Sequence, residues 1–304
     1  MKVSVQSTSG RPLGDYQLPA SATLSSLQPL FHAAHPLYYP DRQRFYPSPA
    51  APSATRPPAL NPDSPLSDAD VLLFKDLGPQ ILWKTVFLLE YLGPLLLYPL
   101  FYNQPRWIYG DAIHAAVTPW AREVQFSALM AWTFHYAKRE LETLFVHRFS
   151  HATMPLSNLF KNSIYYWGFA AYVAYFVNHP LYTPPKEDLV YTGMCLFYFM
   201  EVGNLSAHWT LRMLRPPGTK VRRIPRGGLF ELVSCPNYTY EILSWLGFNM
   251  MTKTIAGLLF MCAGAFQMLV WAGSKHRRYK KEFDGKDGRA LYPPSRKILI
   301  PFLY

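Results

Sequence analysis

The chain has 304 residues, of which 50% are hydrophobic and only 16% are charged. Soluble domains carry about a quarter charged residues, so this composition excludes a chain made of ordinary soluble domains alone. The net charge of +11 does not indicate a nucleic-acid partner, because Lys and Arg gather beside apolar runs, at 212–226 and 275–297. That placement is typical of cytoplasmic loops of membrane proteins and of sites for anionic groups such as nucleotide or coenzyme A phosphates.

Residues 1–76 have the pattern of a small domain built from strands and one helix. Apolar residues alternate with polar ones in the first strand-like run, and turn residues follow it. The order of the elements predicts a ubiquitin-like β-grasp domain. A flexible insertion rich in Pro, Ala and Ser is expected at 46–65. The strand-like runs lie at 3–5, 15–18, 42–45 and 71–74, and the helical pattern at 25–32.

Residues 77–304 contain the long apolar runs. The first, 81–102, is about twenty residues long, the length that crosses a bilayer. We expect an all-α polytopic membrane domain of about six or seven transmembrane helices. The opening MKVSVQSTSG lacks the apolar core of a signal peptide, so the N-terminal domain is expected in the cytosol. Further runs lie at 126–135, 163–177, 189–205, 242–251 and 255–273.

Glu90 lies in the middle of the first apolar run. A carboxylate at membrane depth is costly, so it is expected to face a protein cavity and to have a partner. Two interpretations remain open: a functional group in such a cavity, or a structural hydrogen bond between helices.

A cluster of polar and charged residues follows the apolar run at 126–135. Continued as a helix, this segment places Tyr136 and Arg139 on one face and Lys138 and Glu142 on another. Alternatively, Glu140 and Glu142 pair with Arg or Lys at a helix end that faces water. Arg139 and Tyr136 lie nearest the apolar stretch, which favours a functional role for these two.

The stretch 201–245 is the most informative. Asn204 and His208 are four residues apart and share a helix face. A loop at 212–228 combines arginines with prolines and glycines, which suits phosphate binding, although a merely positive cytoplasmic loop has the same composition. Residues 233–241 then place Pro, Asn, two Tyr and Glu directly before an apolar helix. No metal-ligand spacing, GxGxxG or P-loop occurs, so we expect no metal site and no standard soluble nucleotide fold.

These motifs resemble the steroid 5-alpha-reductase superfamily, and within it the very-long-chain trans-2-enoyl-CoA reductase branch. The N-terminal domain distinguishes this branch from the steroid reductases. The resemblance covers nearly the whole chain. The matching motifs are Gly203–Ser206, Leu214–Pro216, Val233–Glu241, Lys281–Phe283, Tyr292–Pro294 and Ile300–Tyr304.

The resemblance implies a multi-pass enzyme of the endoplasmic reticulum membrane. Its substrate would be a long-chain trans-2-enoyl-CoA, its cofactor NADPH, and its product the saturated acyl-CoA that completes each fatty-acid elongation cycle. Other enzymes of the elongation complex would be its partners.

The resemblance also implies roles for individual residues. Tyr238 matches the proposed proton donor, and Lys138 and Arg139 match an essential basic pair. Tyr136 and Glu90 match the pair that holds the substrate carbonyl, and the division of labour between the two tyrosines stays open. Gln80 and Glu90 match a polar pair around the first span, and His208 and Trp271 depart from the steroid-reductase pattern and are left out. The residues that fall where the superfamily binds NADPH are Arg139, Asn204, Arg215, Arg223, Asn237, Lys275 and Tyr279.

Two alternatives remain. One is a reductase of the same superfamily that acts on a steroid or polyprenol. The N-terminal domain and the sequence Cys235–Tyr238 argue against this alternative. A non-catalytic membrane scaffold of an elongation complex would consume no NADPH, and it leaves the polar residues inside the apolar runs unexplained.

Overall fold

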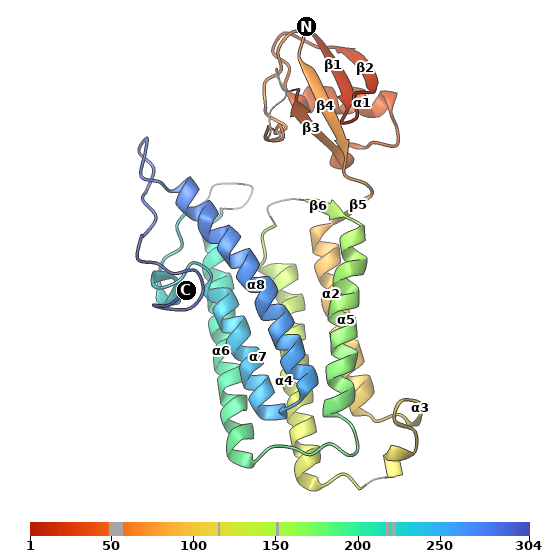
Figure 1. The fold of residues 1–304 in the computed structure, drawn as a ribbon, viewed down its shortest axis with the longest axis vertical. Coiled ribbons are helices and arrows are strands. Elements are labelled where there is room, and N and C mark those ends of the chain that lie inside the picture. The colour runs from red at the N-terminus through yellow and green to blue at the C-terminus, as the bar shows by residue number, and fades with distance from the viewer. Residues whose placement is uncertain (49–56, 115, 150–151, 217–218, 220–222) are drawn as a thin grey trace. The chain divides into compact units, whose positions relative to one another are not determined.

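The computed structural model describes residues 1–48, 57–114, 116–149, 152–216, 219 and 223–304. The protein is mostly helical, with a small strand-containing domain at the N-terminus (Figure 1). It divides into two compact units, Met1–Trp83 with His151–Asn158, and Lys84–Ser150 with Leu159–Tyr304.

A four-stranded sheet and one helix form most of the first unit. In β1 the alternating residues Val3 and Val5 are buried, and they share a core with Leu27 and Phe31 of α1. The sheet order is β2-β1-β4-β3, with β1 and β4 parallel and the two outer pairs antiparallel. The predicted strands and helix are confirmed, with small shifts at their ends. They are β1 (Lys2–Ser7), β2 (Pro12–Gln17), α1 (Leu24–Ala34), β3 (Gln43–Pro47) and β4 (Val71–Asp76).

The predicted insertion at 46–65 lies partly outside the described residues, which resume at 57. Its described flanks belong to the folded unit. Tyr46 and Pro47 are part of β3, and Pro65 forms a bridge with Thr23. Leu60 packs against the core of the unit. Apolar side chains in these flanks thus complete the small core.

A second, two-stranded sheet joins β5 (Gln80–Leu82) to β6 (Thr153–Pro155) in antiparallel register. Both strands belong to the first unit. The Gln80 side chain donates to the carbonyl oxygens of Leu77 and Gly78 at 3.2 and 3.0 Å, so it is bonded to the loop just before it.

Helices make up the second unit, and each predicted apolar run lies in one, except that the first two residues of the run at 81–102 belong to β5. Thr118 caps α4 and Thr254 caps α8, each accepting a hydrogen bond from a peptide N–H of the first turn. Proline occupies the first position of α4 and α7, where a missing N–H costs nothing. The helices are α2 (Trp83–Tyr102), α3 (Arg106–Tyr109), α4 (Pro119–Phe145), α5 (Ser157–Val177), α6 (Glu187–Met213), α7 (Pro236–Thr252) and α8 (Ile255–Glu282).

Helix α7 packs against α4, α6 and α8 (Figure 1). Its contact with α6 is close because Gly193 and Gly247 face each other. A Cβ built on Gly193 would lie 2.5 Å from the carbonyl oxygen of Gly247. Trp132 of α4 is fully buried beside Trp245 of α7, with ring centroids 5.3 Å apart. The helices that carry the polar motifs are thus held at fixed separation.

Two of the helices in the described parts of the chain, α2 and α8, are long and apolar enough to cross a bilayer by length and composition. Charged residues interrupt the other long helices, for example Lys138 and Arg139 in α4 and Glu201 in α6. The number of six to seven transmembrane helices therefore stays a prediction.

Candidate active site

A cavity of about 500 Å³ lies within the helical unit. Side chains of α2, α4, α6, α7 and α8 line it, together with the segments that follow α4 and α6. Seven cations and one acid, Glu282, are among the described lining residues, so the cavity favours an anionic ligand. The cations are Arg139, Arg148, Arg212, Arg215, Arg223, Lys275 and Arg278.

Most of the residues predicted from the sequence meet at this cavity. They come from segments that are far apart in the chain, and the packing of α4, α6, α7 and α8 brings them together. The predicted residues that line it are Arg139, Arg215, Arg223, Asn237, Tyr238, Lys275 and Tyr279.

The start of α7 carries Asn237 and Tyr238 to the cavity wall. The two residues before Pro236 are held by the C-terminal segment: their peptide N–H groups donate to the carbonyls of Lys297 and Ile298 at 2.8 and 3.2 Å. Oδ1 of Asn237 is buried and accepts no hydrogen bond from the described residues. Its acceptor capacity is therefore not used by any of the described residues.

Lys138 and Arg139 are adjacent in α4 and share Glu142, but their other partners differ. Arg139 donates to the hydroxyl of Tyr91 at 2.7 Å and to Oε2 of Glu142 at 3.0 Å. Lys138 is 8% exposed and donates to Oδ1 of Asn204 at 2.5 Å. Its Nζ also lies 3.6 Å from Glu142. Glu142 pairs with both cations, but at 1% exposure it is not at a wet helix end.

Asn204 connects α6 to the start of α7. Its Nδ2 donates to the backbone carbonyl of Asn237 at 2.9 Å and lies 3.1 Å from Oε2 of Glu241. Because Lys138 occupies the other end of the same amide, three helices are joined directly behind the cavity wall. Asn204 and Lys138 thus lie one layer behind the side chains that line the cavity.

Tyr136 and Glu90 are buried but are not among the described residues that line the cavity. Glu90 accepts a hydrogen bond from Nδ2 of Asn162 at 2.8 Å, which joins α2 to α5. This contact is the hydrogen bond between helices that one of the two interpretations of Glu90 expected. A functional role for Glu90 remains a prediction. Tyr136 packs against Trp132, and its hydroxyl has no hydrogen-bond partner among the described residues.

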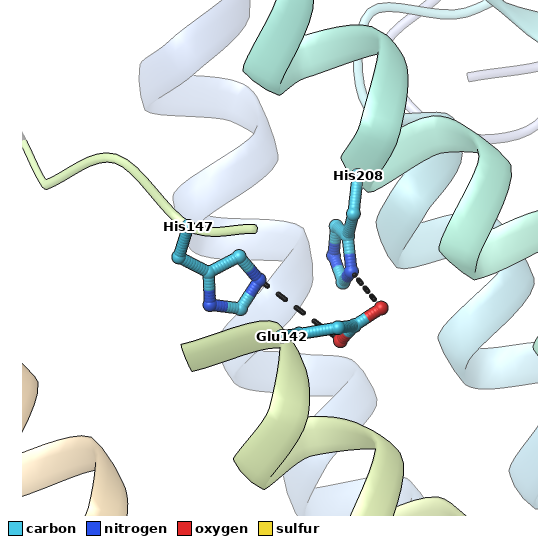
Figure 2. A group of neighbouring side chains, drawn as sticks. All are labelled: Glu142, His147 and His208. Atoms are coloured by element: carbon cyan, nitrogen blue, oxygen red, sulfur yellow. Dashed lines mark hydrogen bonds and ion pairs between the residues drawn. The ribbon is translucent and has the colours of Figure 1, made fainter. Parts of the chain in front are cut away.

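Figure 2 shows the carboxylate of Glu142 between two imidazoles. Nδ1 of His208 lies 2.9 Å from Oε1, and Nε2 of His147 lies 4.0 Å from Oε2. Such a set could hold a metal ion by its ligand types. However, Arg139 and Lys138 are 3.0 and 3.6 Å from the same carboxylate, and their charges oppose a dication. Burial, reinforced by the charges of Arg139 and His208, lowers the pKa of His147 to about 2 and keeps this imidazole neutral.

Several residues of the site were missed from the sequence. His208 and Trp271 were set aside, yet both line the cavity. Glu201 is buried against Lys138, and the signal that singled out Glu90, a carboxylate inside an apolar run, was present for it as well. Glu241 and His135 also bond within this layer, and only the positions of the helices show that they meet.

Residues 152–304 match the family model described as 3-oxo-5-alpha-steroid 4-dehydrogenase. That segment contains the loop after α6, the start of α7 and the end of α8.

Relatives are similar over most of the chain. A very-long-chain enoyl-CoA reductase of Dictyostelium discoideum is 54% identical over 250 residues, covering 81% of this chain and 80% of that protein. A probable very-long-chain enoyl-CoA reductase of Caenorhabditis elegans is 54% identical over 246 residues, covering 78% and 77%. A trans-2,3-enoyl-CoA reductase-like protein of Mus musculus is 37% identical over 294 residues, covering 93% and 78%. The chain belongs to the very-long-chain enoyl-CoA reductase branch of the 3-oxo-5-alpha-steroid 4-dehydrogenase family.

Proposed function

We propose that this protein reduces the trans-2 double bond of a very-long-chain enoyl-CoA with NADPH, giving the saturated acyl-CoA in the last step of the fatty-acid elongation cycle. Family membership supports an oxidoreductase that acts on a CH–CH group of an enoyl-CoA. The observation that carries the proposal is the cavity, whose described lining combines seven cations with Tyr238.

The residues present fit a phosphorylated nicotinamide cofactor. Arg215, Arg223 and Lys275 supply positive charge for its phosphates, and guanidinium groups can bind phosphate through two parallel hydrogen bonds. Asn237 lines the same cavity, and its Oδ1 has no hydrogen-bond partner among the described residues. Tyr279 lies at the same wall, with its ring 5.9 Å from Nζ of Lys275. When bound, NADPH supplies the hydride for the β-carbon of the substrate.

Tyr238 is the proposed donor of the proton to the α-carbon. It lines the cavity beside Trp271, at a ring-centroid distance of 6.4 Å, and on the same wall as Lys275. Negative charge builds on the thioester oxygen as the β-carbon is reduced, and fixed donors at that oxygen lower the barrier.

The hydroxyl of Tyr136, buried without a partner among the described residues, is the proposed donor to that oxygen, with Glu90 as its predicted companion. Lys138 and Arg139 contribute the positive charge behind these groups, and Asn204 keeps Lys138 in place. These roles rest on burial and hydrogen bonding in the helical unit.

We place the enzyme in the endoplasmic reticulum membrane, with residues 77–304 as its membrane catalytic domain. The two long apolar helices α2 and α8 support membrane insertion. The sheet order β2-β1-β4-β3 with a parallel central pair supports a ubiquitin-like β-grasp domain, which we place in the cytosol. Other enzymes of the elongation complex are its proposed partners.

The test is oxidation of NADPH by the detergent-purified protein, with and without a long-chain trans-2-enoyl-CoA. Enoyl-dependent oxidation with saturated acyl-CoA as product supports the proposal. Turnover with an enone steroid or a polyprenal but not with enoyl-CoA would move the substrate to the alternative class. No NADPH oxidation with any of them would favour the scaffold. NADH in place of NADPH tests the choice of cofactor.

The proton donor is tested with Tyr238→Phe and Tyr136→Phe side by side. Loss of one positioned acid typically costs about 10²–10⁴ in rate. A sharp loss of kcat in Tyr238→Phe, with NADPH binding retained, is expected if Tyr238 is the proton donor. Near-normal turnover by Tyr238→Phe would remove Tyr238 from this role.

A further inference from the structure

Five side chains, four of them buried and Glu241 partly buried, form a closed ring behind the cavity wall. Oε1 of Glu201 is hydrogen-bonded to Nδ1 of His135 at 2.8 Å. Its Oε2 lies 2.9 Å from Nζ of Lys138. The other nitrogen of His135 lies 3.4 Å from Glu241, whose second oxygen is 3.1 Å from Nδ2 of Asn204. Asn204 closes the ring by accepting from Lys138 at 2.5 Å. The members come from α4, α6 and α7.

Glu201 is the most enclosed charge of this ring. Its side chain is 0% exposed, and those of Lys138 and Glu241 are 8% and 16% exposed. A carboxylate with no access to water is retained only where positive or hydrogen-bonding groups compensate it. Both of its oxygens face such groups, one from His135 and one from Lys138.

The position of Lys138 depends on a competition between two carboxylates. Its Nζ is 2.9 Å from Glu201 but 3.6 Å from Glu142. Without the charge of Glu201, the ammonium group would turn toward Glu142 and away from Asn204. Glu142 also holds Arg139, at 3.0 Å, so the same movement would disturb a cation that lines the cavity.

Asn204 connects Lys138 to the residues of the cavity wall. The amide oxygen of Asn204 faces Lys138, so its Nδ2 faces the backbone carbonyl of Asn237 at 2.9 Å. Asn237 and the next residue, Tyr238, both line the cavity. A chain of direct contacts therefore leads from Glu201 to the proposed proton donor.

We infer that Glu201 is a positioning residue for the reduction, acting through Lys138 and Asn204 on the start of α7. This inference rests on the proposed function, in which Lys138 and Tyr238 serve the chemical step. The cofactor-holding cations Arg215, Arg223 and Lys275 have no contact with Glu201 among the described interactions. Loss of its charge is therefore expected to lower kcat by a larger factor than it lowers the affinity for NADPH, to which Arg139 also contributes.

Glu201→Gln is the first variant, because it keeps the shape of the side chain and removes the charge. We expect kcat to fall at least about tenfold, with the NADPH dissociation constant from tryptophan fluorescence changed less than about threefold. Glu187→Gln is the matched control, since Glu187 is exposed in the first turn of the same helix. It keeps the kcat of the unmodified protein.

A double-variant cycle separates positioning from a general effect on folding. If Glu201 acts through Lys138, then Glu201→Gln with Lys138→Gln is about as slow as Lys138→Gln alone. If the fold-losses of kcat in the two single variants multiply in the double variant, the inference is overturned. A kcat for Glu201→Gln within about twofold of normal would also overturn it. A normal kcat for Lys138→Gln would remove the proposed role of Lys138 and the inference with it. A slow Lys138→Gln beside a normal Glu201→Gln would overturn the inference alone.

A second variant covers the case in which Glu201→Gln does not fold. Glu201→Asp keeps the charge and shortens the side chain by one methylene, which weakens its reach to Lys138. A protein that binds NADPH normally but turns over more slowly supports positioning. Normal kcat for Glu201→Asp, together with an unfolded Glu201→Gln, would assign Glu201 a purely structural role.

Discussion

The hydroxyl of Tyr91 lies 2.7 Å from Nη2 of Arg139, and the guanidinium carbon sits 4.9 Å from the centroid of the same tyrosine ring. Glu142 holds the other terminal nitrogen of Arg139 at 3.0 Å. The guanidinium is therefore fixed from α2 as well as from its own helix. Because Arg139 lines the cationic cavity, α2 helps to orient a group that faces the ligand.

Tyr91→Phe removes the hydrogen bond and keeps the ring under Arg139. A hydrogen bond to a charged group contributes about 1.5–3 kcal/mol, so we expect the NADPH dissociation constant to rise about tenfold. Titration of tryptophan fluorescence measures it. Tyr172→Phe on α5, where the ring is 40% exposed, is the control and binds NADPH normally. An unchanged affinity in Tyr91→Phe would show that Arg139 does not need this contact.

Close packing of α6 on α7 leads to a second prediction. A Cβ on Gly193 would meet the carbonyl oxygen of Gly247 at 2.5 Å and the peptide nitrogen of Met251 at 2.7 Å, and backbone atoms cannot move aside cheaply. Overpacking of this kind costs about 1–3 kcal/mol, so Gly193→Ala should lower the apparent melting temperature in detergent.

The control for this prediction has the opposite expected sign. Gly168 lies in α5, and a Cβ there would have nothing within 4 Å. Alanine is favoured over glycine inside a helix by about 0.5–1 kcal/mol, so Gly168→Ala should leave the melting temperature unchanged or raise it. Equal effects of the two variants would contradict the close contact of Gly193 with Gly247.

Local patterns were sufficient to predict most of the elements. The alternation of apolar and polar residues identified β1, and apolar runs identified every long helix. Both patterns arise because buried faces require apolar residues at regular positions. Arg215, Arg223, Lys275 and Tyr279 were predicted as cofactor residues from the resemblance, and the cavity does bring them together.

Partners across helices could not be predicted in the same way. Glu201 and His135 are separated by more than sixty positions, and only the packing of α4 against α6 makes them meet. A wet helix end was one of the open interpretations of Glu142, because its neighbours in sequence are charged, whereas its neighbours in space bury it. The register of β5 with β6 likewise depends on tertiary contacts that periodicity does not encode.

The first unit contains an ion pair that predicts a response to pH. Arg42 donates two hydrogen bonds to Asp76, at 2.9 and 2.5 Å. The hydrogen bond from Arg42 holds the pKa of Asp76 below its usual value of 3.8. Because the folded pKa is the lower one, the stabilisation is present above 3.8 and is lost as the pH falls through the folded value.

Arg42→Met should therefore weaken the sheet at neutral pH and have little effect in acid. Hydrogen exchange of the β3 and β4 amides measures this, as faster exchange in the variant at pH 7 and a difference that closes below 3.8. Arg44→Met is the control on the same strand, since Arg44 is exposed. A difference between Arg42→Met and the unmodified protein that persists or grows in acid would mean that burial of the Arg42 side chain, and not the ion pair, is responsible.

Ser234 holds the C-terminal segment against the helices. Its side chain is fully buried, and Oγ lies 2.5 Å from Nδ1 of His276 and 2.7 Å from the hydroxyl of Tyr292. It also lies 3.1 Å from the carbonyl of Lys297. The residues that follow Ser234 lead directly into α7, which begins at Pro236, so this contact also helps to position Tyr238 in the first turn of that helix.

Ser234→Ala leaves two buried polar groups without this partner, and such a loss costs about 1–3 kcal/mol. The apparent melting temperature should fall by about 2–4 °C for each kcal/mol. Because the start of α7 loosens as well, the loss of kcat should exceed that of Ser206→Ala, a control whose side chain is exposed on α6. Thermal denaturation in detergent and NADPH oxidation measure the two effects on the same preparations. A lower melting temperature with unchanged kcat would confine Ser234 to stability, because the start of α7 would then keep its position without this hydrogen bond.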